Sequence, residues 1–309
     1  MRCLVTGGAG FIGSHLAEAL VGTHEVTVFD DFSTGKKENL KAFSGKVRVI
    51  RGDVRNPKLL SVAMRGVDTV FHQAAVVSVQ ESLENPRKTY EVNAAGSWNV
   101  FQAASEQGVK TVVYASSCSV YGEGSKKALG ESAPLNPLSF YADSKRAVEA
   151  QASLFYRIRG LRAVGLRYFN VFGPRQSAGS PYSGVISLFL KRWKAGERPV
   201  IYGDGNQLRD FVYVKDIVQA NLIAAQRGKG GEVFNVATGR SVSLNRVSHE
   251  MNSLFRASLK PRYEAARKGD IRYSRADITA LCRLGFKPRY DLRTGLRAFA
   301  EPSGMEVGR

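Results

Sequence analysis

The chain has 309 residues, of which 43% are hydrophobic and 23% are charged, a composition typical of a globular protein with a substantial core. Its formal net charge is +18, but lysine and arginine are spread along the whole sequence, so we interpret them as a basic surface and expect no nucleic-acid partner. No apolar run is long enough for a membrane span, and a strand pattern starts at residue 2 with no signal-peptide pattern before it. We therefore expect a cytoplasmic protein with no membrane partner.

The three cysteines and four histidines are scattered along the chain, with no C-x-x-C or H-x-x-x-H spacing. This distribution argues against a disulfide framework and against a zinc site, and it fits a reducing compartment. We expect no bound metal.

The first thirty residues show the pattern of a strand, a glycine turn, a helix and a second strand. Residues 2–6 are apolar and lead into a glycine cluster, residues 14–21 have helical spacing of apolar side chains, and residues 25–30 are β-rich and end in an acid. This order predicts a βαβ unit with parallel strands.

Strands and helices continue to alternate to about residue 168. Further strands are predicted at residues 47–50, 67–72, 111–115 and 163–167, and long helices at residues 86–108 and 141–159. The alternation predicts the α/β class, a Rossmann-type doubly wound parallel sheet covered by helices on both faces. We assign residues 1–168 to this domain and expect residues 210–240 to pack back on it. After the Phe-Gly-Pro at residues 172–174 the elements shorten, so residues 169–309 are assigned mainly to a smaller C-terminal substrate-binding lobe.

Gly7, Gly10 and Gly13 follow the first predicted strand and open the first predicted helix. Glycine at this spacing permits a tight turn, a close approach of the backbone to a pyrophosphate, and close packing of the helix on the sheet. The helix N-terminus then offers free N–H groups to the phosphates. Asp30, at the end of the second strand, is placed to accept hydrogen bonds from the adenosine ribose and would repel a 2′-phosphate, so the sequence favours NAD over NADP.

Other residues expected around NAD lie in the glycine loop, after Asp30, and after the third and fourth strands, at the sheet edge where ligands bind in such folds. The cofactor set from these segments is Gly7, Gly10, Phe11, Ile12, Gly13, Asp30, Asp31, Phe32, Ser33, Thr34, Gly35, Asp53, Val54, Gln73, Ala74 and Ala75.

Tyr141 and Lys145 are four residues apart, so on a helix they share one face. A tyrosine is a poor base at pH 7, but a nearby ammonium group and a positive nicotinamide ring lower the pKa of its phenol. Ser117, at the end of a predicted strand, is a candidate to hold the substrate oxygen in line. These three residues predict a proton-transfer device for oxidising an alcohol beside a hydride acceptor.

With these motifs the chain resembles the UDP-glucose 4-epimerase family of extended short-chain dehydrogenases/reductases. The resemblance covers almost the whole length and rests on the segments at residues 6–14, 53–54, 116–122, 141–145, 167–170, 173–176, 203–205, 209–211 and 267–270. It implies an enzyme in which Ser117, Tyr141 and Lys145 are catalytic, and Tyr141 and Lys145 also lie at the cofactor. By the same resemblance Asn93 is an active-site asparagine and Phe169 lies by the nicotinamide.

The resemblance also implies a UDP-sugar substrate whose carbon 4 is inverted through a transient 4-keto intermediate. Arg209 and Arg267 match diphosphate-binding arginines, and Asn170 matches an amide at the phosphate and sugar. The full expected substrate set is Ser117, Tyr141, Asn170, Val185, Val200, Tyr202, Arg209, Arg267, Asp270 and Ser274. A small residue at Ser274 suggests space for an N-acetyl group, so UDP-GlcNAc and UDP-GalNAc join UDP-glucose and UDP-galactose as candidates; a shift of one residue would place Tyr273 there and reverse this inference.

Three alternatives stay open. Related 4,6-dehydratases and decarboxylases carry an acidic residue where this chain has Cys118 and Ser119, which disfavours both reactions. The pattern around Asn170 and Phe172 differs from that of UDP-glucuronate 4-epimerases and leans away from a uronic acid. A non-catalytic NAD sensor is expected to have lost Tyr141 or Lys145. The resemblance further implies a homodimer through the helices at residues 86–108 and 141–159, for which Val148, Leu154 and Phe155 are the apolar candidates, although these could also be core.

Overall fold

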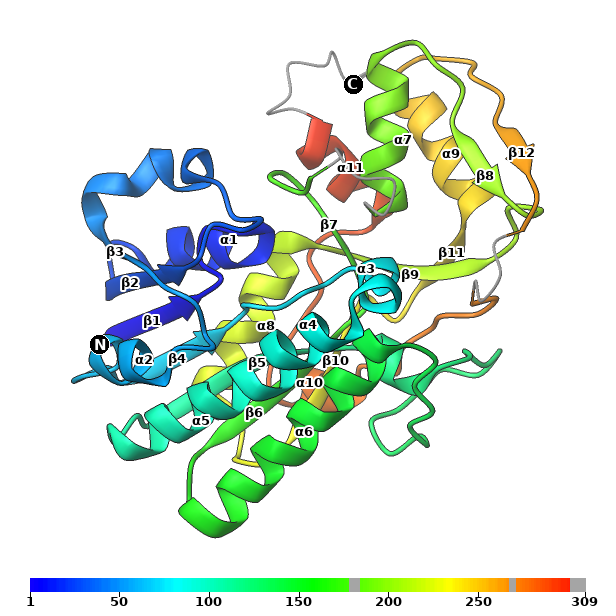
Figure 1. Cartoon of the computed structure of the whole chain (residues 1–309). Helices are drawn as coiled ribbons and strands as arrows, with labels where there is room; N and C mark the ends of the chain where they lie inside the picture. The colour runs from blue at the N-terminus through cyan, green and yellow to red at the C-terminus, as the bar shows by residue number, and fades with distance from the viewer. Residues whose placement is uncertain (178–183, 267–270, 301–309) are drawn as a thin grey trace.

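The structure, a computed structural model, describes residues 1–177, 184–266 and 271–300. Its largest element is a seven-stranded sheet in the order β10-β6-β5-β4-β1-β2-β3, in which every pairing is parallel (Figure 1). The strands are β1 (Arg2–Thr6), β2 (Glu25–Asp30), β3 (Val47–Arg51), β4 (Thr69–His72), β5 (Thr111–Ser117), β6 (Ala163–Tyr168) and β10 (Val233–Val236). The predicted fold class is confirmed.

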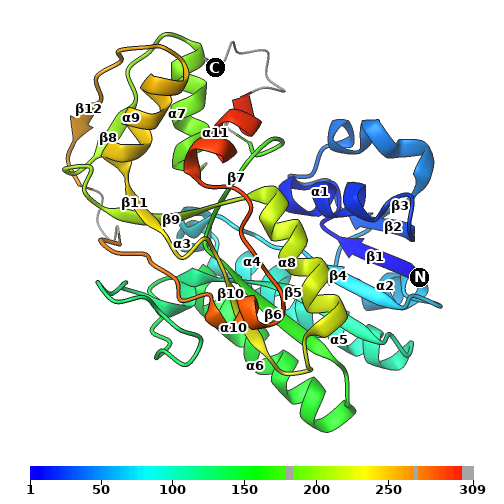
Figure 2. The same ribbon diagram turned by 180° about the vertical axis from the view of Figure 1, so that it is seen from behind.

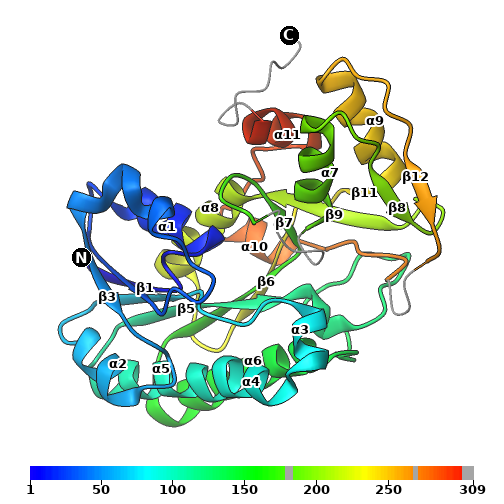
Figure 3. The same ribbon diagram turned by 45° about the horizontal axis from the view of Figure 1, so that its top comes forward.

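Helices cover both faces of this sheet, as the tilted view in Figure 3 shows. One face packs against α1 (Phe11–Leu20), α8 (Val214–Arg227) and the 3-10 segment η1 (Lys37–Lys46). The other packs against α2 (Pro57–Ala63), α5 (Gly96–Glu106) and α6 (Phe140–Arg159). Because both faces are covered, the central strands are apolar on both sides, and β6 is buried along its whole length.

The order of the strands indicates where along the sheet a ligand is expected to bind. The chain runs outward from β1 through β2 to β3, then crosses back to β4 on the other side of β1. At such a switch point the loops after neighbouring strands diverge and leave a crevice at the carboxyl ends. The glycine loop after β1 and the segment after β4 therefore flank the same crevice.

The C-terminal part adds a smaller layer, seen above the sheet in Figures 1 and 2. It contains a three-stranded sheet, β11-β9-β7, and a two-stranded sheet, β12-β8, with its own apolar core. Its elements are β7 (Asn170–Phe172), α7 (Val185–Lys194), β8 (Val200–Tyr202), β9 (Leu208–Tyr213), β11 (Ser241–Ser243), α9 (Leu244–Leu254), β12 (Arg262–Glu264) and α11 (Leu292–Ala300). Between β9 and β11 the chain returns to the large sheet through α8 and β10, and α10 (Thr279–Arg283) packs near β10.

Several boundaries differ from the sequence-based expectation. Helix α1 begins at Phe11 rather than at residue 14, because Gly10 already provides its N-cap. Strand β4 begins at Thr69 rather than at residue 67. The single helix expected at residues 86–108 is α4 (Pro86–Tyr90), a π-helical turn η2 (Glu91–Ala95) and α5. A short helix α3 (Val79–Glu84) precedes them, and a 3-10 turn η3 (Cys118–Tyr121) follows β5.

The expected dimer residues divide between core and surface. Val148 and Phe155 are only 1% and 7% exposed and pack in the core, whereas Leu154 is 43% exposed. For Val148 and Phe155 the core alternative therefore holds, because they lie on the side of α6 that packs in the core.

Candidate active site

The glycine loop is packed too closely for side chains. Gly7 has φ +66°, and a Cβ there would lie 2.7 Å from the Ala74 backbone nitrogen; a Cβ at Gly13 would lie 2.1 Å from the Gly7 carbonyl oxygen. Gly10 provides no side-chain cap to α1, so the first N–H groups of this helix remain available to phosphate oxygens. The loop therefore has the shape and the donors that a pyrophosphate needs.

Asp30 lies at the end of β2 and is 5% exposed. Its two carboxylate oxygens accept the N–H groups of Ala9 (2.9 Å) and Phe32 (2.8 Å), so the carboxylate is fixed against the glycine loop. Burial raises the pKa of Asp30, and the two backbone donors oppose this. Each oxygen keeps a lone pair for a ribose hydroxyl, as the NAD prediction requires.

The loop after Asp30 turns sharply beside this carboxylate. Phe32 has φ +60°, and Asp31 accepts both the N–H and the hydroxyl of Ser33. A Cβ at Gly35 would lie 2.7 Å from Asp30 Oδ1. The segment 31–35, with Thr34, therefore lies where the adenosine end of NAD is expected.

The residues expected after β3 and β4 lie at the same edge of the sheet, where the parallel strands end. The Asp53 carboxylate is held by the Arg55 guanidinium (2.6 Å), which lowers its pKa, and Val54 is buried. The Gln73 side chain donates to Asn221 and accepts from Tyr168, so its amide is engaged within the protein. Ala74 and Ala75 are half-buried, and their small size leaves the backbone close to Gly7.

The catalytic candidates come together at the carboxyl end of β5 and the first turns of α6. Ser139 caps α6 by accepting the Ala142 N–H (3.1 Å), which places Tyr141 in the first turn. The Lys145 ammonium, one turn later, donates to the Ala115 carbonyl (2.9 Å), and Ser117 hydrogen-bonds to the Tyr141 phenol. The structure thus brings Ser117, Tyr141 and Lys145 to one point.

Burial has the largest effect on the pKa values of Tyr141 and Lys145. It raises the pKa of Tyr141 to about 12, and the hydrogen bond from Ser117 opposes this. Burial lowers the pKa of Lys145 to about 8, and the negative charge of Glu149 opposes this. The expected lowering of the Tyr141 pKa by Lys145 is therefore outweighed in the chain by desolvation of the phenol.

Asn93 lies in the π-helical turn η2 and is 1% exposed. Its Oδ1 accepts the Val76 N–H (2.8 Å), and its Nδ2 donates to the Val76 carbonyl (2.9 Å) and to Ser144 Oγ (3.0 Å). Both N–H groups are therefore used within the protein, and Asn93 holds the backbone after β4 against α6.

A buried histidine supports this turn. His72 hydrogen-bonds through Nδ1 to Thr6 Oγ1 and through Nε2 to Ser97 Oγ, and Ser97 Oγ hydrogen-bonds to the Asn93 carbonyl. Burial lowers the pKa of His72 to about 3, so the ring is neutral. The sequence analysis gave His72 no role, although His72 is the last residue of β4, the strand next to the glycine loop.

The substrate candidates of the smaller lobe meet the catalytic group through β9. Burial raises the pKa of Cys118 to about 12, and the Arg209 guanidinium opposes this, which places the charge of Arg209 beside η3. Phe169 is buried against Tyr121, and Asn170 Nδ2 donates to the Asp210 carbonyl (3.1 Å). Arg209 and Asn170 therefore lie on neighbouring strands of one sheet, β9 and β7.

The remaining candidates surround this sheet or lie outside the described residues. Val200 and Tyr202 are half-buried on β8, and Val185 begins α7. Ser274 is 8% exposed, and its N–H donates to the Leu208 carbonyl on β9. Arg267 and Asp270 fall in the part of the chain that the structure does not describe.

Comparison with known proteins now identifies the family. A model of the NAD dependent epimerase/dehydratase family matches residues 3–237. The chain belongs to this family. The membership confirms NAD as the cofactor and makes the chain an enzyme of the epimerase/dehydratase type.

The relatives of this chain differ in the sugar on which they act. A putative UDP-glucose 4-epimerase of Methanocaldococcus jannaschii is 37% identical over 301 residues, which cover 95% of each chain. A UDP-N-acetyl-alpha-D-glucosaminuronate decarboxylase of Bacillus cytotoxicus is 36% identical and covers 84% of this chain and 82% of its own. The solved structure of the UDP-N-acetylglucosamine 4-epimerase of Methanobrevibacter ruminantium M1, in complex with UDP-N-acetylmuramic acid, has a TM-score of 0.92 at 39% identity and covers 97% and 98% of the two chains.

Two positioning contacts of this epimerase/dehydratase were missed from the sequence. Arg175, with φ +67°, ion-pairs with Glu18 on α1 (2.6 Å), and His15 Nε2 hydrogen-bonds to the Pro174 carbonyl (2.9 Å). The segment between β7 and α7 is thereby tied to the helix that follows the glycine loop. Pro174 and Arg175 belong to the motif at residues 173–176, but no local spacing relates residues 157 positions apart.

A buried ion pair one helical turn from Lys145 was also missed from the sequence. Glu149 is one turn after Lys145 on α6 and is paired with Arg167 of β6 (2.7 Å), with both side chains less than 9% exposed. The sequence contained a usable signal, because Tyr141, Lys145 and Glu149 are spaced by four residues and so share one helical face.

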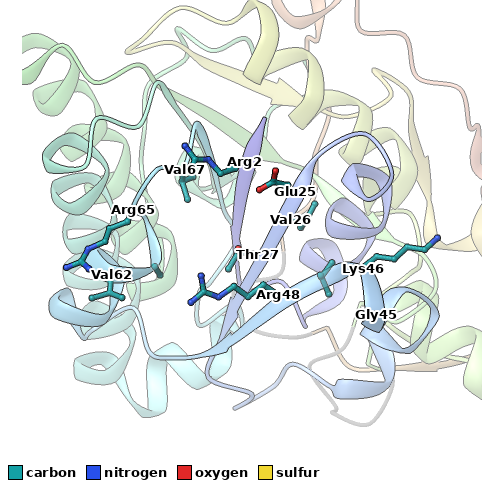
Figure 4. A pocket seen from close by; sticks show the side chains of 12 residues that line it. Arg2, Glu25, Val26, Thr27, Gly45, Lys46, Arg48, Val62, Arg65 and Val67 are labelled. Carbon is teal, nitrogen blue, oxygen red and sulfur yellow. The ribbon is translucent and has the colours of Figure 1, made fainter.

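A cavity of about 760 Å³ lies away from all of these residues. It opens at the amino-terminal ends of β1, β2 and β3, at the other end of these strands from the glycine loop, and Figure 4 shows the exposed cations Arg2, Lys46, Arg48 and Arg65 around it. Among the described residues no cluster of metal-ligating side chains is found, and no helix combines the length and apolarity of a membrane span.

Replacing Gly13 with alanine tests the glycine loop. We expect Gly13→Ala to be purified with about tenfold less NAD or lower still, because the new Cβ would overlap the Gly7 carbonyl and displace α1. The measurement is the NAD released per protein on denaturation. Gly45→Ala is the matched control, since a Cβ there meets nothing within 4 Å; equal NAD in Gly13→Ala and wild type would contradict the assignment.

Proposed function

We propose that this enzyme is an NAD-dependent 4-epimerase of UDP-hexoses. The observation that carries the proposal is the contact of Ser117 with Tyr141, on a helix whose Lys145 is fixed to Ala115, at the edge where the glycine loop lies. UDP-glucose and UDP-galactose are the proposed substrates, with UDP-GlcNAc and UDP-GalNAc accepted as well.

In the proposed reaction Tyr141 takes the proton of the sugar 4-hydroxyl and later returns a proton to the 4-oxygen of the inverted sugar. Ser117 donates a hydrogen bond to the 4-oxygen and holds it in line with the phenol. Lys145, as an ammonium ion, favours the phenolate and is held in place by the Ala115 carbonyl. NAD, which the glycine loop and Asp30 would hold, would supply a hydride acceptor for carbon 4 of the sugar and a hydride donor for its return.

The residues beside Ser117 support epimerisation over the related eliminations. A dehydratase or decarboxylase needs a further acid and base here, and this chain offers Cys118 and Ser119. Burial raises the pKa of Cys118 to about 12, so its thiol stays protonated and is no base at neutral pH. Ser119 hydrogen-bonds to Ser117 and has no acidic proton to give.

Ser274 supports the acceptance of N-acetylated sugars. It lies two residues before Ala276, which packs with Phe169 and Tyr121, and both Ser274 and Ala276 are buried. Tyr273 is directed elsewhere, because its carbonyl contacts Gly124 and its ring lies 6.0 Å from the Lys126 ammonium. This alternation favours Ser274 over Tyr273 as the residue that limits the sugar.

From the same contacts we infer that the two parts of the chain bind different ligands. We assign NAD binding mainly to residues 1–168 and the UDP-sugar mainly to residues 169–309, with Arg209 and Arg267 at the diphosphate. A non-catalytic sensor is the alternative, and the intact trio of Ser117, Tyr141 and Lys145 favours the enzyme.

The direct test is product analysis with the purified protein and no added reductant. We expect UDP-galactose to be converted to UDP-glucose, and UDP-GalNAc to UDP-GlcNAc. Tyr141→Phe should lower both rates by about a thousandfold while keeping its NAD, because the general base is lost and the cofactor site is not. Full activity of Tyr141→Phe, or a dehydrated or decarboxylated product from the wild type, would overturn the proposal.

Enlarging residue 274 tests the sugar limit. Ser274→Tyr should lower turnover of UDP-GalNAc by about tenfold or more and leave UDP-galactose within about threefold, because a phenol would fill the space of the acetyl group. Ser274→Ala is the control and should turn over both sugars. The inference fails if Ser274→Tyr slows the two sugars equally.

We also propose a homodimer through α5 and α6. Trp98, Leu154 and Ile158 are 44%, 43% and 71% exposed on these helices, and such apolar side chains favour burial by a second copy. Light scattering should give twice the mass of one chain, and Ile158→Glu should halve it. A wild-type monomer at micromolar concentration would rule this out.

A further inference from the structure

The hydroxyl of Ser117 is surrounded by defined partners. As the cap of η3, Ser117 Oγ accepts the Ser119 N–H (3.2 Å), and it also accepts the Ser119 hydroxyl (2.9 Å). The Tyr141 phenol and the Cys118 thiol are its other side-chain partners. Residue 119 therefore contacts the catalytic serine twice, once through its backbone and once through its side chain.

The number of lone pairs on Ser117 Oγ determines whether Ser117 donates or accepts its remaining hydrogen bond. A serine hydroxyl has one proton to donate and two lone pairs with which to accept. Ser119 occupies both lone pairs, so the single proton of Ser117 is left to donate. Between the Tyr141 oxygen and the Cys118 sulfur the oxygen is the stronger acceptor, since sulfur accepts only weakly.

We propose that Ser119 is a positioning residue, whose hydroxyl forces Ser117 to donate its proton to the oxygen of Tyr141 and, in the Michaelis complex, to the 4-oxygen of the sugar. The proposal rests on the proposed epimerase reaction for its catalytic consequence, but the direction of the Ser117 proton holds for any substrate. No proton is created or consumed, since Ser119 acts only by filling the lone pairs of Ser117.

This direction matters because the phenolate of Tyr141 gains from a donor. A hydrogen bond donated to the charged form lowers the pKa of an acid, and Ser117 has this effect on Tyr141. Without the Ser119 hydroxyl, Ser117 gains a free lone pair, and its proton no longer has to point at Tyr141. A smaller fraction of Tyr141 would then be ionised at neutral pH, while the site would keep its shape.

Two other titratable groups surround the phenol. Cys118, on η3, raises the pKa of Tyr141 when its thiol is ionised, and Lys145 lies one turn along α6. Neither is altered by a change at residue 119, and the Ser119 N–H that Ser117 caps is kept by every substitution other than proline. A change in the titration of Tyr141 in a residue-119 variant therefore reports the hydroxyl itself.

The test compares Ser119→Ala with Ser119→Thr in the NAD-loaded protein. The ultraviolet titration of the Tyr141 phenolate is obtained as the difference between each variant and the same variant with Tyr141→Phe. We expect Ser119→Ala to raise the pKa of Tyr141 by about one pH unit, and Ser119→Thr, which keeps a hydroxyl, to leave it within about 0.3 unit of the wild type. This measurement uses no sugar, so it stands even if the proposed substrates are wrong.

Kinetics give the second readout. With UDP-galactose, Ser119→Ala should lower kcat about tenfold at neutral pH, recover toward higher pH and leave KM within about twofold. In the Ser117→Ala background the same change should cost nothing further, since Ser119 acts only through Ser117. An unshifted Tyr141 titration in Ser119→Ala, or an equal loss of kcat with and without Ser117, would overturn the proposal.

Discussion

The ion pair between Glu149 and Arg167 is the contact on which the catalytic geometry depends. It is buried and bidentate, with Arg167 Nε and Nη2 donating to the two carboxylate oxygens at 2.9 and 2.7 Å. A buried pair overcomes its desolvation only when the remaining polar groups are satisfied. Here Ser116 Oγ donates to Glu149, and Arg167 Nη1 donates to the Tyr121 hydroxyl and to the Glu131 carbonyl.

These bonds join the elements that carry the reacting groups. Glu149 fixes α6 one turn below Lys145, Ser116 is the neighbour of Ser117 on β5, and Tyr121 closes η3. The network continues from Tyr121 to Asn235 of β10, whose amide donates to the carbonyls of Leu129 and Asp277. The segments that contain Leu129 and Asp277 are thereby attached to the same buried arginine that holds α6.

Much of this arrangement follows from local sequence and the rest follows from packing. The alternation of strands and helices predicts the parallel sheet, and Gly7, Gly13 and Asp30 predict the nucleotide edge, because each has a backbone or charge requirement that few residues meet. The π-turn at Asn93 and the bond of Arg175 to Glu18 escape such reasoning, since each depends on a partner far along the chain. The pKa of Tyr141 escapes it for another reason: the helical spacing shows that Lys145 shares a face with Tyr141, but only the structure shows the desolvation of the phenol.

The central claim is that the hydride taken from carbon 4 returns to the same carbon on its other face. It is tested most directly with UDP-galactose that carries deuterium at carbon 4, incubated with the purified protein without added NAD. We predict UDP-glucose that retains the deuterium at carbon 4, because the bound cofactor holds the label between the two transfers. Loss of the deuterium to solvent, or its appearance in NADH released from the protein, would contradict the account.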